Sequence, residues 1–306
     1  MRAHRSRFAN RCYNQRYLIL MIAPFVVWLA IFSFGPISGW LMSFQNYSPA
    51  KGLLGSDWVG LANFSKLFQT KQIVQVLRNT LVISSLGIVA GNVFPLIFAL
   101  SLNEVSNLRF KKSIQTITYL PHFVSFVVVA NIFLTLFSVD GAFNSLLMAL
   151  GLIKAPTQVW ADKNAFWGMV TFVNVWKEIG WNSIIYLATI SAIDMEQYEA
   201  ATIDGCGRFQ KIRYITLPSL VPVMMLLWIL SLGDIFNAGF DASYLLGNPV
   251  TRDVAEVIDT HVFRMGIENG MFSFSTAITL FKIVMGFILV FISNAVARRY
   301  SEYSLW

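Results

Sequence analysis

The sequence has 306 residues, of which 56% are hydrophobic and only 13% are charged, so an ordinary soluble globular domain of this size is excluded. Its formal net charge of +7 comes from 23 Lys and Arg against 16 Asp and Glu. In a membrane protein such an excess gathers in cytoplasmic loops, so it gives no reason to expect a nucleic-acid partner.

Six apolar stretches are each long enough to cross a hydrocarbon core of about 30 Å as a helix. The sequence therefore predicts an all-α polytopic membrane protein whose single transmembrane domain, 17–306, contains six transmembrane helices. The predicted helices are 17–44, 80–103, 114–138, 165–191, 217–246 and 272–297.

The distribution of basic residues predicts the orientation. Residues 1–16 contain five arginines and no acid, which indicates a cytoplasmic N-terminal segment rather than a cleaved signal peptide. Counted over alternate loops, thirteen Lys and Arg lie on the side of the N-terminus and eight on the other side. By the positive-inside rule, both termini are predicted to be cytoplasmic.

No catalytic or metal-binding pattern is visible. The two cysteines, Cys12 and Cys206, indicate no disulfide framework, and the three histidines lie too far apart in the sequence to predict a metal site. His122 is interpreted as a packing or pore-lining residue. Because no GxxxxGK[ST] loop occurs, an ATPase site is not expected on this chain. The few histidines and the lack of a recognisable nucleophile-and-base motif disfavour an intramembrane enzyme.

Residues 192–218 form the most polar long stretch between two apolar ones. Asp194 can cap a helix that begins at Met195, and Gly205 can end it because glycine tolerates the left-handed backbone conformation. Pro218 suits the first turn of the next helix, where its missing N–H costs little. On these signals alone, a passive interfacial helix pair and a docking element for a partner protein are both open.

Within this stretch, "EAATIDG" and the later Ile215, Leu217 and Pro218 resemble the EAA loop of binding-protein-dependent ABC importer permeases. The stretches "YLPHFVSFVVVA", "WKEIGWNSIIYLATISAID" and "VAEVIDTHVFRMGI" resemble, more narrowly, the maltose-type permeases of the LplB-like subgroup, which import oligosaccharides and polysaccharide fragments. The resemblance covers nearly the whole chain and implies the type I importer, or MetI-like, fold.

The resemblance also implies partners and a location. The chain would be the permease subunit of an ATP-driven oligosaccharide importer in the bacterial cytoplasmic (inner) membrane, paired with a second, homologous permease in a heterodimer. An extracytoplasmic solute-binding protein would deliver the sugar. Two copies of a cytoplasmic ATPase would bind ATP and Mg, so no cofactor is expected on this chain.

In this family the EAA loop seats in a cleft of the ATPase, and that role is carried over to the matching positions. The residues expected to couple to the ATPase are Glu199, Ala200, Ala201, Asp204, Gly205, Ile215, Leu217 and Pro218.

Ionisable residues inside predicted spans are costly and usually face a bundle interior or a wet cavity. Helical spacing places the polar residues of 174–182 largely on one face, and those of 234–241 on another. Amide and carboxylate groups beside an indole suit a sugar, which has both hydroxyl groups and an apolar ring face. The predicted substrate pathway comprises Asn174, Lys177, Glu178, Trp181, Asn182, Asp234, Asn237 and Asp241.

Other interpretations stay open at this point. Lys177 or Lys282 could instead neutralise Glu178 or Asp234 and hold helices together. Two lysines against three acids give no support for a strongly anionic ligand, so a neutral or mixed oligosaccharide is favoured. An ion-coupled secondary transporter that uses Glu178 and Asp234 is an alternative, although no internal repeat is visible. A permease for a substrate other than a sugar is another.

Overall fold

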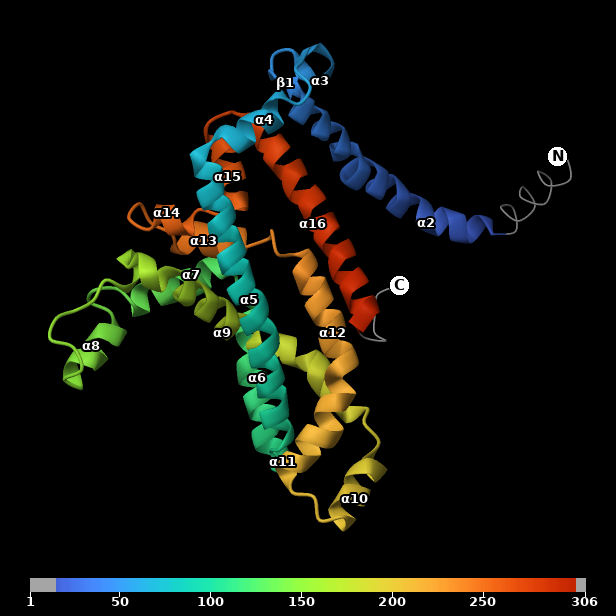
Figure 1. Ribbon diagram of the computed structural model, residues 1–306, viewed down its shortest axis with the longest axis vertical. Helices are drawn as coiled ribbons and strands as arrows, with labels where there is room; N and C mark the ends of the chain where they lie inside the picture. The colour runs from blue at the N-terminus through green and yellow to red at the C-terminus, as the bar shows by residue number, and fades with distance from the viewer. Residues whose placement is uncertain (1–14, 301–306) are drawn as a thin grey trace, which may run out of the picture.

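The computed structural model describes residues 15–300, which are mostly helical (Figure 1). The predicted N-terminal segment 1–16 therefore lies almost wholly outside the described residues. The first half of the chain contains α2 (Arg16–Leu29), the π-helical η1 (Ala30–Phe34), the 3₁₀-helical η2 (Gly35–Phe44), β1 (Gln45–Asn46), α3 (Gly52–Gly55), β2 (Asp57–Trp58), α4 (Ala62–Gln69), α5 (Lys71–Asn103), α6 (Leu108–Phe123), α7 (Phe126–Leu136) and α8 (Ala142–Ala149).

The second half continues with two long helices and the shorter elements between and after them. These are η3 (Val159–Ala161), α9 (Lys163–Ser191), α10 (Met195–Ile203), α11 (Arg208–Lys211), the π-helical η4 (Ile212–Thr216), α12 (Leu217–Gly233), α13 (Phe240–Leu246), α14 (Arg252–Ala255), α15 (Ile258–Phe263), the π-helical η5 (Arg264–Glu268) and α16 (Phe272–Tyr300).

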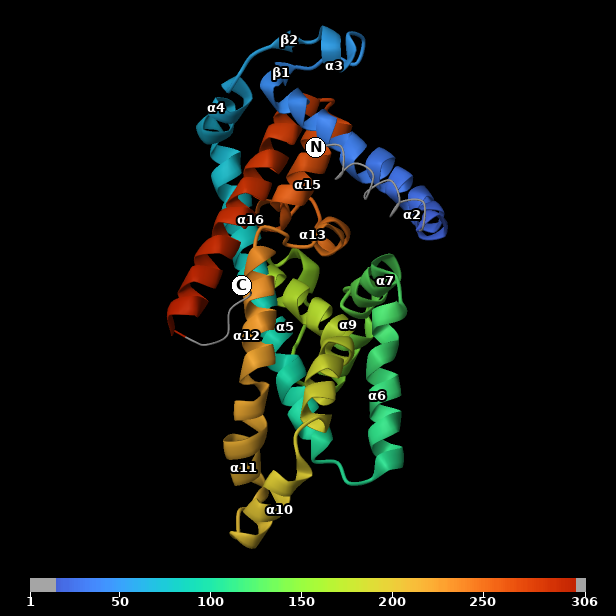
Figure 2. The same cartoon turned by 90° about the vertical axis from the view of Figure 1, so that its right-hand side faces the viewer.

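The molecule is elongated, with α10 and α11 at one end of its long axis and α3, α4 and the two-stranded antiparallel β1–β2 pair at the other (Figure 1). We call these the α10 end and the sheet end. In the view of Figure 2, α5 and α9 lie between α12 on one side and α6 on the other.

Among the described residues, four continuous helical segments are long and apolar enough to cross a membrane: Arg16–Phe44, Lys71–Asn103, Arg208–Gly233 and Phe272–Ala295. The all-α polytopic prediction is therefore confirmed. Helix α9 matches the predicted 165–191 in extent, but polar side chains interrupt it and it is not among the four. The predicted helix 217–246 ends at Gly233, because Asp234–Gly239 leave the helical path.

The predicted continuous span 114–138 is also corrected. Its two halves, α6 and α7, meet at a bend of 104°. Val124 adopts an extended conformation between them, and Ser125 caps α7 by accepting a hydrogen bond from the Val128 N–H. Pro121 in the last turn of α6 has no N–H to continue the helical hydrogen bonding, which favours a break at this point. The bend turns α7 towards α13 (Figure 2).

Helix α2 leaves the bundle at an angle and has no buried residue along its length (Figure 1). The following η2 returns to the bundle, where its side chains and those of α4 and α16 line an apolar groove. The main core forms where α5, α7, α9 and α13 meet, around Phe166, Val170 and Val173, all fully buried.

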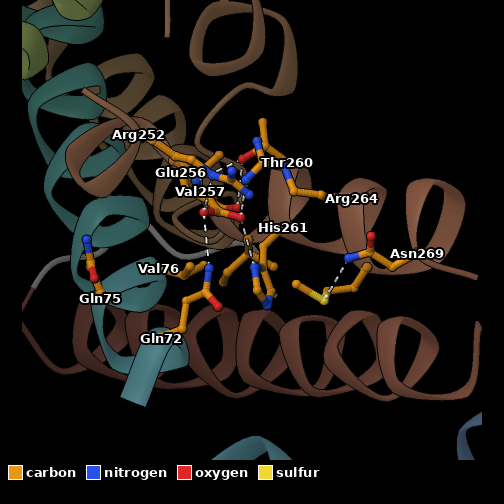
Figure 3. A network of polar contacts seen from close by, with 12 residues as sticks. Gln72, Gln75, Val76, Arg252, Glu256, Val257, Thr260, His261, Arg264 and Asn269 are labelled. Atoms are coloured by element: carbon orange, nitrogen blue, oxygen red, sulfur yellow. Dashed lines mark hydrogen bonds and ion pairs between the residues drawn. The ribbon is translucent and has the colours of Figure 1, made fainter. Parts of the chain in front are cut away.

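A buried carboxylate, that of Glu256, holds the segment between α12 and α16 to the first turns of α5 (Figure 3). Only 6% of Glu256 is exposed, and its carboxylate lies 3.0 Å from His261 Nδ1 and 2.6 Å from Arg264 Nη1. Arg252 lies 3.6 Å away on the same segment, and Gln72 of α5 donates a hydrogen bond of 3.4 Å. A buried charge is tolerated only when it is paired in this way.

Backbone contacts strengthen the same attachment. Asn79 of α5 donates hydrogen bonds to the carbonyls of Asp253 and Glu256, at 2.8 and 3.0 Å, and Thr80 Oγ1 accepts one from the Ile258 N–H at 2.9 Å. Lys163 at the start of α9 pairs with Asp253 at 2.8 Å, and this interaction lowers the pKa of the Asp253 carboxyl. The segment 252–258 is thus tied to both α5 and α9.

Replacing Glu256 by Gln should lower the free energy of unfolding by about 3 kcal/mol at pH 7, because three basic side chains lose their buried partner. Burial raises the pKa of the Glu256 carboxyl, but the hydrogen bond from His261 and the positive charges of Arg264 and Arg252 outweigh it, so the pKa lies below its ordinary value. The stabilisation should therefore be present above about pH 4.3 and decline below it, as the carboxylate is protonated.

Thermal unfolding of the detergent-solubilised protein, followed at pH 7 and at lower pH, would measure both effects. Glu268→Gln is the matched control, since this exposed carboxylate pairs with the same Arg264 at 3.6 Å and should contribute less than about 1 kcal/mol. Equal losses in the two variants would contradict the role given to Glu256.

Candidate functional site

A cavity of about 820 Å³ opens between α5, α9, α12 and the irregular segment after α12. Its wall combines apolar side chains with glycines, amides, hydroxyls, one indole and one carboxylate. The lining residues are Ile83, Ser84, Gly87, Ile88, Gly91, Asn92, Asn174, Trp181, Asn182, Ile184, Ile185, Tyr186, Leu227, Ser231, Asp234, Asn237, Ala238 and Gly239.

Five of the eight residues predicted for the substrate pathway come together at this cavity. Asn174, Trp181 and Asn182 line it from α9, where separations of seven and eight residues bring them to one face. Asp234 and Asn237 line it from the segment that follows α12, and Asn237 Nδ2 donates a 2.9 Å hydrogen bond to Asp234 Oδ1.

Asp241 was predicted to share a helical face with Asp234 and Asn237, and this is wrong. The helix ends at Gly233, and Gly239 adopts a φ of +77°, so a new helix, α13, begins in another direction. Asp241 is exposed at the start of α13 and does not line the cavity.

Lys177 and Glu178 are also absent from the cavity lining, and they pair with each other. Lys177 Nζ lies 2.9 Å from Glu178 Oε1 and donates a 2.8 Å hydrogen bond to the carbonyl of His122. Glu178 Oε2 lies 2.6 Å from His122 Nδ1. The alternative in which Lys177 neutralises an acid is therefore correct for Glu178, and Lys282 pairs with Asp259 of α15 instead of Asp234.

His122 connects this charged group to the cavity. Its ring stacks on the indole of Trp181 with 4.2 Å between centroids and 2° between planes, and Phe123 meets the same indole edge-on. One face of Trp181 is thus covered by an imidazole that Glu178 holds in place. Sequence reasoning missed this role, because 56 residues separate His122 from Glu178 and only the packing of α6 on α9, with Thr118 against Gly180, brings the two together.

The EAA segment forms a helix, α10, with the predicted signals at both ends. Asp194 Oδ1 accepts a hydrogen bond from the Glu196 N–H at 3.0 Å. At the other end Gly205 has a φ of +77°, and the N–H groups of Gly205 and Cys206 bond to the carbonyls of Thr202 and Ala201. This is the Schellman arrangement, which requires the left-handed residue.

Two side-chain hydrogen bonds join α10 to the helix that follows. Tyr198 Oη and Thr216 Oγ1 lie 2.8 Å apart, and Lys211 Nζ donates to Thr202 Oγ1 at 2.6 Å. Because Thr216 is buried in η4 at the start of the 217–233 helix, α10 is attached directly to α12.

The predicted coupling residues lie together at the α10 end, although they differ in exposure. Glu199, Ala200, Asp204, Gly205 and Pro218 are exposed, whereas Ala201, Ile215 and Leu217 are partly buried.

Two large apolar side chains beside them were not predicted. Ile203 is 88% exposed and Phe209 is 82% exposed, one on each side of the Gly205 turn. The sequence offered a signal for both, since each is a large apolar residue in an otherwise polar segment that contains the Gly205 turn.

Residues 71–302 match the model of the family described as binding-protein-dependent transport system inner membrane component. The chain belongs to this family. It is 40% identical over 303 residues to the polygalacturonan/rhamnogalacturonan transport system permease protein YteP of Bacillus subtilis, with 99% of this chain and 94% of the relative covered. Identity to protein LplB of the same organism is also 40%, over 294 residues, with 96% and 92% covered.

A solved structure agrees with this assignment. The bacterial alginate ABC transporter in complex with alginate pentasaccharide-bound periplasmic protein contains a chain that is 34% identical, with a TM-score of 0.88 and coverage of 97% of this chain and 99% of that one. The predicted MetI-like fold and ABC permease family are confirmed, and the chain is a multi-pass inner-membrane protein.

Proposed function

We propose that this chain is the permease subunit of an ATP-driven importer of oligosaccharides, and that the cavity beside Trp181 is its part of the sugar path. The observation that carries the proposal is the lining itself. An indole fixed on one face by His122 offers an apolar surface for a sugar ring, while Asn174, Asn182 and Asn237 offer hydrogen bonds to hydroxyl groups.

The names of similar proteins support a saccharide as the substrate and also bear on its charge. YteP is described as transporting polygalacturonan and rhamnogalacturonan, and the structural neighbour transports alginate, so these relatives carry acidic polymers. Among the described lining residues of this chain, Asp234 is the only charged group and no Lys or Arg occurs. If the substrate is acidic, the cations that balance it come from the second permease.

The proposed assembly contains a second, homologous permease in a heterodimer. Helix α2 supports this arrangement, since it extends away from its own bundle and buries no residue there. Two copies of a cytoplasmic ATPase bind at α10, with ATP and Mg held by the ATPase, and a solute-binding protein docks at the sheet end.

We place the α10 end and both termini in the cytoplasm of a bacterial cell. The exposed Arg208 and Arg213 lie at this end, and Arg298 near the end of α16 is exposed too, which accords with the positive-inside rule. ATP-driven closure of the ATPases would draw the two coupling helices together and open the cavity outward, and hydrolysis would return it inward.

Affinity purification of the tagged chain from its native membrane should recover a second permease and an ATPase. In proteoliposomes, together with the solute-binding protein, this complex should take up oligogalacturonides or maltooligosaccharides of two to six residues only when ATP is inside. A chain that purifies alone and supports uptake driven by an ion gradient would contradict the proposal.

Replacing Gly205 by Val should abolish most ATP-driven uptake, because a β-branched residue at this positive φ costs about 1–2 kcal/mol and distorts the turn that ends α10. Gly207→Val is the matched control. Gly207 lies two residues away with φ −72° and ψ 169°, which valine adopts readily, so uptake should stay near that of the wild type. Equal uptake in the two variants would contradict the role of the turn.

Replacing Trp181 by Ala should raise the sugar concentration for half-maximal uptake about tenfold, since the stacking surface is lost. Trp176→Ala is the control, because this tryptophan is also on α9 and is similarly exposed, at 39% against 42%, but does not line the cavity. Uptake assays on equal amounts of assembled complex would compare them. If the Trp176 variant is impaired and the Trp181 variant is not, the cavity is not the sugar path.

A further inference from the structure

One face of α5 forms a part of the cavity wall that contains none of the predicted pathway residues. Ser84, Gly87, Ile88, Gly91 and Asn92 all line the cavity, and their spacing of three and four residues puts them on a single helical face. This face presents bare backbone at two positions one turn apart, with a hydroxyl one turn before the first of them.

The two glycines differ from others that lie within packed helices. At Gly180 of α9 an added Cβ would collide with the carbonyl of Thr118 in α6, and at Gly233 it would come within 2.7 Å of Val290. At Gly87 and Gly91 an added Cβ would meet nothing within 4 Å. Glycine destabilises a helix interior by about 1 kcal/mol relative to alanine, and packing among the described helices does not require it at Gly87 or Gly91. What distinguishes these two glycines is that both leave the cavity wall free of a side chain.

Ser84 supplies an independent sign of a ligand. Its Oγ is buried and has no hydrogen-bond partner, and only 6% of the residue is exposed although it lines the cavity. On the same helix, Thr80, Asn92 and Ser101 each donate to the carbonyl four residues earlier, at 2.8 Å. A buried hydroxyl without a partner is unfavourable by about 1–3 kcal/mol. Because Ser84 stands in the cavity wall, a rotation of its side chain would turn this hydroxyl towards a group that enters the cavity.

We infer that Ser84, Gly87 and Gly91 form a binding subsite for one pyranose unit of the transported oligosaccharide, which we call the α5 subsite. The ring lies against the bare backbone at Gly87 and Gly91, and a sugar hydroxyl exchanges a hydrogen bond with Ser84 Oγ. Neither atom of this contact carries charge, so the α5 subsite accepts neutral and acidic units alike. The inference rests on the proposed function, because it assigns a place in the same cavity.

The test uses the complete importer in proteoliposomes with its solute-binding protein, and oligogalacturonides and maltooligosaccharides of two to six residues as probes. Gly87→Leu and Gly91→Leu should each raise the half-saturation concentration for uptake at least about tenfold, with longer oligosaccharides affected most, because the new side chain occupies the space of a sugar ring. Gly168→Leu is the control. It makes the same change on α9, also meets nothing within 4 Å, and lies outside the cavity lining.

A second pair of variants tests the α5 subsite even if the leucine substitutions prevent assembly with the other subunits. Ser84→Ala should raise the half-saturation concentration about tenfold, and Ser84→Thr, which keeps the hydroxyl, should restore at least half of that loss on a logarithmic scale. Wild-type kinetics for Ser84→Ala, or equal effects of leucine at Gly91 and Gly168, would overturn the α5 subsite alone. A wild-type importer that takes up no saccharide would overturn the proposed function and the subsite with it.

Discussion

The packing of α5 against α9 is the contact on which the rest of the structure depends. The two helices pack together through Phe166, Val170 and Val173 of α9 and Ile83 of α5, all buried, and Ile83 also borders the cavity. Further along, glycine and amide residues replace these side chains, and the same two helices bound the cavity. In a bilayer, helix association relies on close packing and polar contacts rather than on the hydrophobic effect. The tight contact and the cavity are therefore adjacent features of the same helix pair.

The two lysines within the helices are neutralised by nearby acids, so the described lining of the cavity contains no positive charge. Lys177 is bound to Glu178, and Lys282 to Asp259, so neither lysine can balance an anion in the cavity. The pairing also positions an aromatic surface, because Glu178 hydrogen-bonds to His122, and the His122 ring stacks on the indole of Trp181. An aromatic surface fixed in advance loses little conformational freedom when it binds, which favours affinity without adding any charge.

Local signals predicted the features that depend on local chemistry. Asp194 and Gly205 marked the two ends of α10, and apolar length marked most of the spans, because capping, left-handed glycine and bilayer thickness act within one segment. The errors arose where tertiary contacts decide. Asp241 was placed by extending a helix past Gly233, and His122 lies beside Trp181 because α6 packs on α9, a contact that the sequence does not reveal.

The connection between α10 and the cavity is mechanical. Tyr198 bonds to Thr216 at the root of α12, and α12 then continues as one helix to Gly233, a length of about 26 Å. Asp234, the charged residue of the cavity lining, follows immediately. A displacement of α10 would therefore reach Asp234 at the cavity through one helix and the partly buried Tyr198–Thr216 hydrogen bond. Thr216 ends the π-helical turn η4, where the helical hydrogen-bond ladder is locally disrupted, so the start of α12 is a point at which its direction can change.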